Sequence, residues 1–313
     1  MRGRIRFILA PIAGLLLVAG CGYDETSVPK SPAAETAAGG SSGQAPACDN
    51  ATTSYAPNTD RGAALGELKD KKRLVVGVSA DSYKLGSANP FKNSRIEGFD
   101  IDLAEAIAKA LGVKVQLRVI SAGERIDLLK NDKVDIVARN FTMNCDRWEQ
   151  IGFSAVYYDA AQKVLIRKDT AGAWKKYAGP QDLAGLRVCA PAGTTSIANI
   201  QKIEPDAIAV AAANHTGCLV KFQQGEVDAI TGDDTVLAGL SAQDPYTVVP
   251  DQDELTEEPY GIGVNKKNTD LIRFINSVIE KRRSNGAWQT SYNTWLKPYL
   301  GAQATPPRPE YGR

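Results

Sequence analysis

Two arginines and several hydrogen-bonding side chains follow directly after an apolar run of the chain. The run is residues 134–138, and the set after it comprises Arg139, Asn140, Thr142, Asn144 and Arg147, with Cys145 among them. A guanidinium group is a planar fork of N–H donors that matches the two oxygens of a carboxylate. Such a set stands where a buried strand ends, which is where ligands bind in layered α/β folds.

A second polar set opens a predicted helix further along the chain. Gly193 allows a tight turn, and Thr194 and Thr195 lead into the helix, whose first N–H groups attract anions. Ordinary N-capping by either threonine explains the same residues and is compatible with a binding role. Asp233 and Asp234 stand at the start of another predicted helix.

Residues that serve catalysis or hold metals are scarce. The chain has one histidine, His215, which we place in a loop before a helix, and it has no Cys-x-x-Cys pair. The chain thus has few of the residues that metal sites and histidine-dependent catalysis require, so we expect no enzyme, no metal and no cofactor. The net charge of +1 gives no reason to expect a nucleic-acid partner.

Two repeats of alternating strands and helices should position these residues, which predicts a layered α/β fold. In the first repeat we expect strands at 72–79, 113–120 and 134–138, with helices at 104–112 and 122–130. In the second we expect strands at 186–190, 207–212 and 227–231, with helices at 193–203, 218–224 and 233–243. A strand at 260–264 and helices at 269–285 and 286–296 follow, and a strand at 164–166 should cross between the repeats.

The N-terminal residues 1–20 are typical of a secretory signal, with three arginines before an apolar run too short for a mature membrane span. The run ends in Val-Ala-Gly-Cys, which matches the bacterial lipobox, so Cys21 should carry a lipid anchor on the extracytoplasmic face of the cell membrane. An ordinary secretory signal is the alternative. Residues 21–62 are rich in small and polar residues and should form a flexible tether.

Four cysteines besides Cys21 suit two disulfides, because an exported chain meets oxidising conditions. Cys189 and Cys218 lie close in sequence, one on a predicted strand and one at a predicted helix start, so we expect them to pair. This leaves Cys48 with Cys145. Neither bridge would then join the two strand–helix repeats, so neither would hinder a movement of one repeat relative to the other. Three pairings are possible, and four free thiols are the remaining alternative.

Eight short motifs together resemble the polar amino-acid binding proteins of ABC importers, over about residues 70–297. They are LVVGV at 74–78, GFDIDLA at 98–104, Val134-Asp135, Cys145-Asp146-Arg147 through Tyr157, Gly193-Thr194-Thr195, Val227-Asp228-Ala229 through Asp233, Tyr260-Gly261-Ile262, and Asn285-Gly286 through Leu296. The cysteines look most like those of actinobacterial glutamate- or glutamine-binding lipoproteins. The resemblance implies a two-lobed periplasmic-binding-protein clamshell with two hinge crossings. Lobe one would be residues 63–161 and 260–300, lobe two residues 162–259, and residues 301–313 a disordered tail.

The resemblance also implies roles for particular residues. Arg147 would bind the α-carboxylate of the ligand, helped by Thr142 and the backbone of Asn140, while Thr194 and Thr195 approach it from lobe two. Asp233 would bind the α-ammonium group. Asp234 is the alternative to Asp233 for this role. The chain departs from the family at Ser79, where relatives carry an acidic residue, and Asp81 would substitute for it. Three aromatic residues are alternatives for the one that packs against the ligand: Tyr83, Phe91 and Phe141.

The ligand class rests on Arg139, which should point into the cleft. A buried guanidinium is costly without an anion, and Lys84 would supply a second cation, so glutamate or aspartate fits best and glutamine is the alternative. The alternative is that Arg139 pairs internally with Asp81 or Glu124. We expect a monomer that delivers its ligand to an ABC permease, or alternatively a sensor that signals occupancy to a membrane protein.

Overall fold

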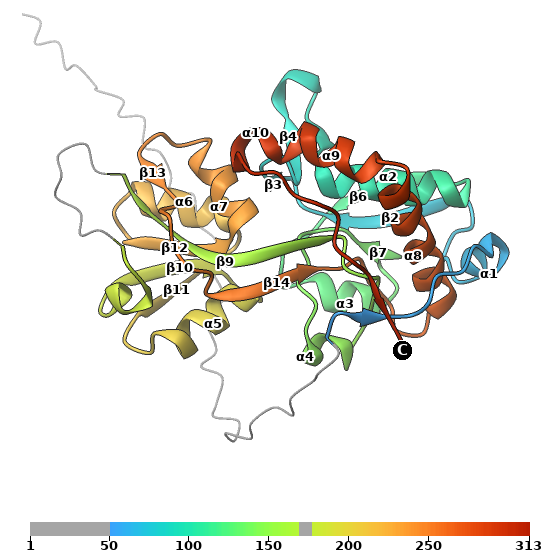
Figure 1. The fold of residues 1–313 in the computed structure, drawn as a ribbon, viewed down its shortest axis with the longest axis horizontal. Coiled ribbons are helices and arrows are strands. Elements are labelled where there is room, and N and C mark those ends of the chain that lie inside the picture. Colours follow the sequence, from blue (N-terminus) through green and yellow to red (C-terminus); the bar gives the residue numbers. More distant parts are fainter. Residues whose placement is uncertain (1–50, 169–176) are drawn as a thin grey trace, which may run out of the picture. The chain divides into compact units, whose positions relative to one another are not determined.

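The computed structural model describes residues 51–168 and 177–313, which form two α/β lobes, each built on its own mixed sheet (Figure 1). The sheet of lobe one has the strand order β6-β2-β7-β15-β8. These strands are β2 (Arg73–Val78), β6 (Lys114–Val119), β7 (Ile136–Val137), β8 (Gly152–Phe153) and β15 (Gly263–Val264). β2 pairs in parallel with β6 and β7, and β15 runs antiparallel to β7 and β8.

The sheet of lobe two has the order β11-β10-β12-β9-β13, with β14 also paired to β9. Its strands are β9 (Tyr158–Arg167), β10 (Arg187–Pro191), β11 (Ile208–Ala212), β12 (Ala229–Asp233), β13 (Thr247–Val248) and β14 (Thr256–Tyr260). β9 is far longer than the predicted crossing at 164–166. Its first half pairs with β14 and its second half with β12, so β9 and β14 run together as the two connections between the lobes (Figure 1).

Helices follow the strands much as the periodicity predicts. Lobe one carries α1 (Arg61–Gly66), α2 (Phe99–Leu111), α3 (Arg125–Lys130), α4 (Cys145–Trp148), α8 (Thr269–Ser284), α9 (Ala287–Trp295) and α10 (Lys297–Leu300). Lobe two carries α5 (Thr195–Ile203), α6 (His215–Gln223) and α7 (Asp234–Ser241). Short 3-10 turns lie at Pro90–Lys92 and Pro180–Leu183. α2 ends at Gly112, whose φ of 72° suits a left-handed helix cap.

Three regions differ from the prediction. The predicted strand at 260–264 is the end of β14 followed by the separate strand β15, because the chain leaves the sheet of lobe two and enters that of lobe one. Helix α6 begins at His215, which is not in a loop, because Asn214 caps the helix with its side chain. The segment between β2 and α2, for which we predicted no elements, forms a small antiparallel sheet of β3 (Asp81–Ser82), β4 (Gly86–Asn89) and β5 (Arg95–Glu97).

The predicted disordered tail and the last part of the predicted tether are both wrong. β1 (Thr53–Ser54) pairs in parallel with β16 (Glu310–Tyr311), so segments 256 or more residues apart hold each other against lobe one. The Ser54 side chain is fully buried and donates to the Phe153 carbonyl at 2.8 Å. Backbone pairing and this buried contact order segments that have too few apolar residues to be recognised from sequence.

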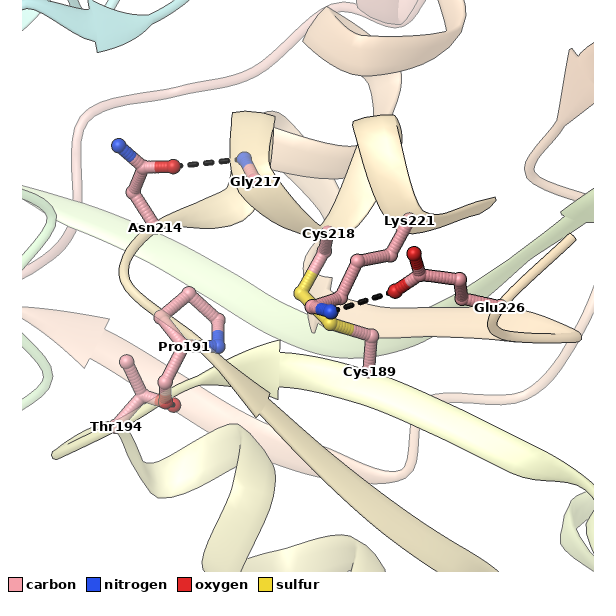
Figure 2. The surroundings of a disulfide bond; sticks show 8 residues. All are labelled: Cys189, Pro191, Thr194, Asn214, Gly217, Cys218, Lys221 and Glu226. Carbon is pink, nitrogen blue, oxygen red and sulfur yellow. Dashed lines mark hydrogen bonds and ion pairs between the residues drawn. A yellow bond between two sulfur atoms is a disulfide. The ribbon is translucent and has the colours of Figure 1, made fainter. Parts of the chain in front are cut away.

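The predicted bond between Cys189 and Cys218 is present, with the two Cα atoms 5.6 Å apart. It joins β10 to α6 inside the core of lobe two, as Figure 2 shows, and both cysteines are fully buried. Cys48, the signal at 1–20 and Cys21 lie outside the described residues, so those predictions stay predictions. In the described part of the chain, no helix is both long and apolar enough to span a membrane.

Candidate functional site

Arg147 lies on the short helix α4, and 7% of its surface is exposed. Its backbone N–H donates to the Oδ1 of Asn144, the residue that caps this helix, at 3.0 Å. The guanidinium donates to the Thr142 carbonyl and lies 5.0 Å from the ring centre of Phe141. Burial lowers the pKa of Arg147, and the charges of Glu258 and Asp233 act against this shift. The predicted carboxylate-binding residue is thus a buried cation.

Arg125, on α3, is a second buried guanidinium, which the sequence analysis missed. It is 3% exposed and lies 4.2 Å from the ring centre of Phe141, as the neighbour of Arg147 over the same ring. Its nitrogens donate only to backbone carbonyls, among them Ala122 at 2.7 Å and, from lobe two, Gly193 at 3.3 Å. Burial lowers the pKa of Arg125 well below its ordinary value, and the charge of Arg147 lowers it further.

Arg139 is the third buried guanidinium, with 6% of its surface exposed. Its Nε donates to the Ile120 carbonyl at 3.1 Å. The alternative in which Arg139 pairs with Asp81 or Glu124 is not what the structure contains. Among residues 51–168 and 177–313, none of these three arginines forms an ion pair with a carboxylate. Three buried cations without an ion pair are costly unless a ligand supplies the anion.

Asp233 is the buried anion of lobe two and ends β12, directly before α7. It is 4% exposed, and its Oδ2 accepts hydrogen bonds from the Tyr260 hydroxyl and, across the lobes, from Asn140 Nδ2 at 3.4 Å. Burial first, and then the charge of Glu258, raise the pKa of Asp233 to about 7. Because this carboxylate is removed from solvent, a cationic ligand group would strongly stabilise its ionised form. Asp234 is half-buried, and its carboxylate accepts hydrogen bonds from the backbone N–H groups of Thr235 and Ala161.

Asn140 has the unusual backbone angle φ of 32°, and Asp100 at the start of α2 holds it there. The Asn140 N–H donates to Asp100 Oδ2 at 2.9 Å, and the Asn140 carbonyl accepts from Arg125. Both backbone groups of Asn140 therefore have internal partners, and the prediction that its backbone binds the ligand stays a prediction. The side chain is better placed, since its Oδ1 is buried without a hydrogen-bond partner.

The start of α5 presents Thr194 and Thr195 toward different partners. Thr194 Oγ1 donates to the Pro191 carbonyl at 2.7 Å, and neither threonine caps the helix with its side chain, so the simple capping interpretation does not hold. Thr195 Oγ1 donates to Glu258 Oε2 at 2.7 Å. Glu258 is 1% exposed, and the sequence analysis missed it because its segment lacked a recognisable strand pattern. Because the hydroxyl of Thr195 donates its proton to Glu258, the donor of Thr195 that remains for a carboxylate ligand is its backbone N–H.

Asp81 and Lys84 are placed differently from the buried set. Asp81 Oδ2 accepts from the Thr216 hydroxyl of lobe two at 3.0 Å, so it links the lobes at a part-exposed position. Lys84 Nζ lies 5.2 Å from the ring centre of Tyr83 and 5.6 Å from that of Trp295. The aromatic faces thus hold the ammonium group of Lys84, and the prediction that it adds a second cation beside Arg139 stays a prediction.

His215 is a third residue that the sequence analysis did not assign to the site. Its Nε2 is buried without a hydrogen-bond partner and lies against the backbone of Gly232, next to Asp233. Burial first, and then the charge of Arg139, lower the pKa of His215 to about 4. A hydrogen bond to the Thr231 backbone acts against this shift and fixes the ring so that Nε2 is the unprotonated nitrogen. The sequence signal for this residue was Asn214 directly before it, because asparagine is a favoured residue at the start of a helix.

Comparisons with known proteins agree with this geometry. A profile of the bacterial extracellular solute-binding proteins, family 3, matches residues 74–298. The glutamine-binding protein GlnH of Bacillus subtilis is 32% identical over 237 residues, covering 74% of this chain and 84% of that protein. The glutamate-binding protein GluB of Corynebacterium glutamicum is 28% identical, covering 68% of this chain and 75% of that protein.

Solved structures show the same relationship. An ancestral arginine-binding protein bound to glutamine has a TM-score of 0.67 and 30% identity, covering 72% of this chain and 98% of that one. The family profile, over residues 74–298, covers both lobes and the segments that carry the three arginines and Asp233. This chain therefore belongs to family 3 of the bacterial extracellular solute-binding proteins.

Proposed function

We propose that this protein captures an amino acid outside the cytoplasm and delivers it to an ABC transporter permease, and that the ligand is glutamate or aspartate. One observation carries the proposal: three buried guanidiniums of lobe one, which form no ion pair in the described chain, lie close enough to Asp233, a buried carboxylate of lobe two, for its charge to raise the pKa of each. An α-amino acid carries both charges within a few bonds, so it complements both lobes and stabilises them against each other.

Each charge of the ligand then has a partner. Arg147 and the N–H groups at the start of α5 would bind the α-carboxylate, while Asp233 and Asn140 Oδ1 would bind the α-ammonium group. Arg139 and Arg125 remain for the side chain of the ligand. Two guanidiniums favour a carboxylate there and disfavour a cationic side chain, although arginine-binding proteins are among the solved relatives.

Calorimetry with residues 48–313 tests this function. We expect one-to-one binding of L-glutamate or L-aspartate and no heat with L-arginine at the same concentration. Tight binding of arginine, with none of the acidic or amide amino acids, would overturn the ligand class. The same set of measurements on the full chain in membranes tests delivery when the permease is present.

The position of His215 favours glutamine as a second candidate. An unprotonated Nε2 accepts a hydrogen bond from a side-chain amide but repels a carboxylate, unless it takes up a proton. Asp81 favours this proton, whereas Arg139 and Arg125 oppose it. Glutamate binding should therefore raise the pKa of His215 and take up a proton, whereas glutamine binding should not.

Calorimetry in buffers of different ionisation enthalpy measures this proton directly. Asp233 should release part of a proton when it binds the ammonium group of either ligand, so glutamine supplies the baseline. At pH 6 to 7 we expect glutamate to take up part of a proton relative to glutamine, and this difference should disappear in His215→Ala. Equal proton exchange for the two ligands in the wild type would remove His215 from the side-chain site. Tighter binding of glutamine than of glutamate at every pH would assign the amide as the ligand.

A further inference from the structure

Both ends of the described chain meet on the back of the helix that carries Arg147. Residues 51–55 and 310–313, here called the terminal clasp, pair through β1 and β16. The backbone N–H groups of Gly312 and Arg313 donate to the Ser54 carbonyl at 3.0 and 3.2 Å, and Arg313 Nε donates to the Thr53 carbonyl at 2.7 Å. The two segments thus form one unit, although nearly the whole chain lies between them.

Trp148, the last residue of α4, is the point where the terminal clasp contacts the site. Its indole Nε1 donates to the Ala51 carbonyl at 2.7 Å, and its ring meets Tyr55 edge-on at 6.4 Å between centres. The Arg313 guanidinium lies 3.8 Å from the ring centre of Trp148. Residues from both ends of the chain therefore contact the side chain next to Arg147.

A row of aromatic rings continues from Trp148 to the buried arginines. Trp148 meets Phe153 edge-on at 5.5 Å, and Phe153 meets Phe141 edge-on at 5.0 Å. Phe141 in turn carries Arg125 and Arg147 over its ring. The terminal clasp also reaches Phe153 directly, because Ser54 donates to its carbonyl.

Asn276 of α8 fixes the same segment from the opposite side. Its Nδ2 donates to Ser54 Oγ at 3.0 Å and to the Tyr55 carbonyl at 2.7 Å, while its Oδ1 accepts from the Ala155 N–H at 2.7 Å. Asn276 is fully buried. The buried side chain of Asn276 therefore joins the terminal clasp, the segment after β8 and the core helix α8 through hydrogen bonds.

α4 needs such support, because a helix of four residues cannot form on its own. A guanidinium that binds a carboxylate through two hydrogen bonds also depends on its orientation, which a small shift of α4 would change. We propose that Trp148 and Arg313 are positioning residues: the terminal clasp holds α4 and the Phe141 ring so that Arg147 faces the α-carboxylate. This inference rests on the proposed amino-acid binding.

Affinity measurements on Arg313→Ala and on a chain lacking residues 306–313 test the inference. Both should weaken binding of glutamate and of glutamine by the same factor, about tenfold, because the α-carboxylate is common to the two. Arg313→Lys, which keeps a cation over Trp148, should restore binding to within about twofold of wild type. Arg308→Ala is the matched control, an exposed arginine of the same segment.

A double-mutant cycle separates positioning from general stability. In an Arg147→Lys background the bidentate contact is already lost, so Arg313→Ala should weaken binding much less than it does in the wild type. An unchanged affinity in Arg313→Ala and in the truncated chain, or an equal loss in both backgrounds, overturns the inference. If the wild-type protein binds no amino acid, the proposed function fails first, and the inference fails with it.

Discussion

The cationic and anionic sides of the site are held in different ways. On lobe one, Arg147 and Arg139 stand on a four-residue helix and on the loop after a two-residue strand, supported from behind by aromatic rings and the terminal clasp. On lobe two, Asp233 ends a five-residue strand in the middle of a sheet, and Tyr260 holds it by a hydrogen bond. The cations depend on distant packing, whereas the anion depends on regular secondary structure.

This difference suggests which side is more easily disturbed. An irregular segment has few backbone hydrogen bonds of its own, so changes far from the ligand can move it. A strand between two neighbours is fixed by its pairing, so only changes at the carboxylate itself should matter there. Remote substitutions should therefore affect Arg147 more than Asp233.

Arg147→Ala should have the largest effect on binding. A hydrogen bond to a charged group contributes about 1.5–3 kcal/mol, so the loss of a bidentate pair should weaken binding of every amino acid more than about a hundredfold. Calorimetry with glutamate and glutamine measures this, with Arg95→Ala, an exposed arginine, as the control. Binding within about threefold of wild type would place the α-carboxylate elsewhere.

Asp233→Asn should weaken binding nearly as much and also change the dependence of stability on pH. The pKa of Asp233 is raised to about 7 in the folded protein, so between pH 4 and pH 7 the folded state binds more protons than the unfolded state. The free energy of unfolding of the ligand-free protein therefore falls as the pH rises through this window. The substitution should make that slope shallower, because Asp100 and Asp234, whose pKa values are raised to about 6, still contribute to it. It should also stabilise the ligand-free protein at pH 7 by a few kcal/mol, since each unit of raised pKa corresponds to about 1.4 kcal/mol.

The ligand-free protein favours the protonated form of Asp233, whereas a bound ligand favours the ionised form. Its ammonium group favours the ionised carboxylate, so the affinity of the wild type should rise with pH up to about 7 and then level off. Denaturant unfolding and calorimetry between pH 5 and pH 8 measure both effects, with the exposed Asp206→Asn as the control. A pH slope of stability that is as steep in Asp233→Asn as in the wild type would assign the whole slope to other groups.

Much of this site was predictable, because its residues stand where regular elements end. Arg147 and Asp233 follow strands and open helices, and family motifs surround both. Arg125 was not recognised, since within a predicted amphipathic helix it has the pattern of a surface residue. Glu258 was missed because β14 pairs with β9, and a strand that lies between two lobes shows no alternation of its own.

The terminal clasp shows a different limit. Thr53 and Glu310 pair across 257 positions, and neither segment has an apolar pattern that would predict a strand. The position of Asn140 at a left-handed φ likewise depends on Asp100, 40 residues earlier in the chain. Such contacts follow from the assembled fold, whereas sequence periodicity reports on local structure alone.

Arg139→Ala should have a smaller effect, and one that depends on the ligand. Without this guanidinium a carboxylate side chain loses one of its two nearby cations, whereas an amide loses much less. The ratio of glutamate to glutamine affinity should fall about tenfold or more, while glutamine itself binds within about threefold of wild type. A competition assay with both ligands measures the ratio. An equal loss for the two would assign Arg139 to the α-carboxylate or to the fold.

Removing the Cys189–Cys218 bond should have the smallest effect on binding and sharpens the comparison of the two sides. The bond closes a loop with a sequence separation of 29, for which the chain-entropy model gives about 3–4 kcal/mol of stabilisation. A Cys189→Ser, Cys218→Ser double variant should therefore unfold at a lower denaturant concentration. Its affinity should stay within about twofold, because strand pairing and Tyr260 fix Asp233 without the bond. A lower affinity for every ligand would show that the anionic side also depends on remote packing, whereas a changed glutamine-to-glutamate ratio would show that helix α6 positions His215.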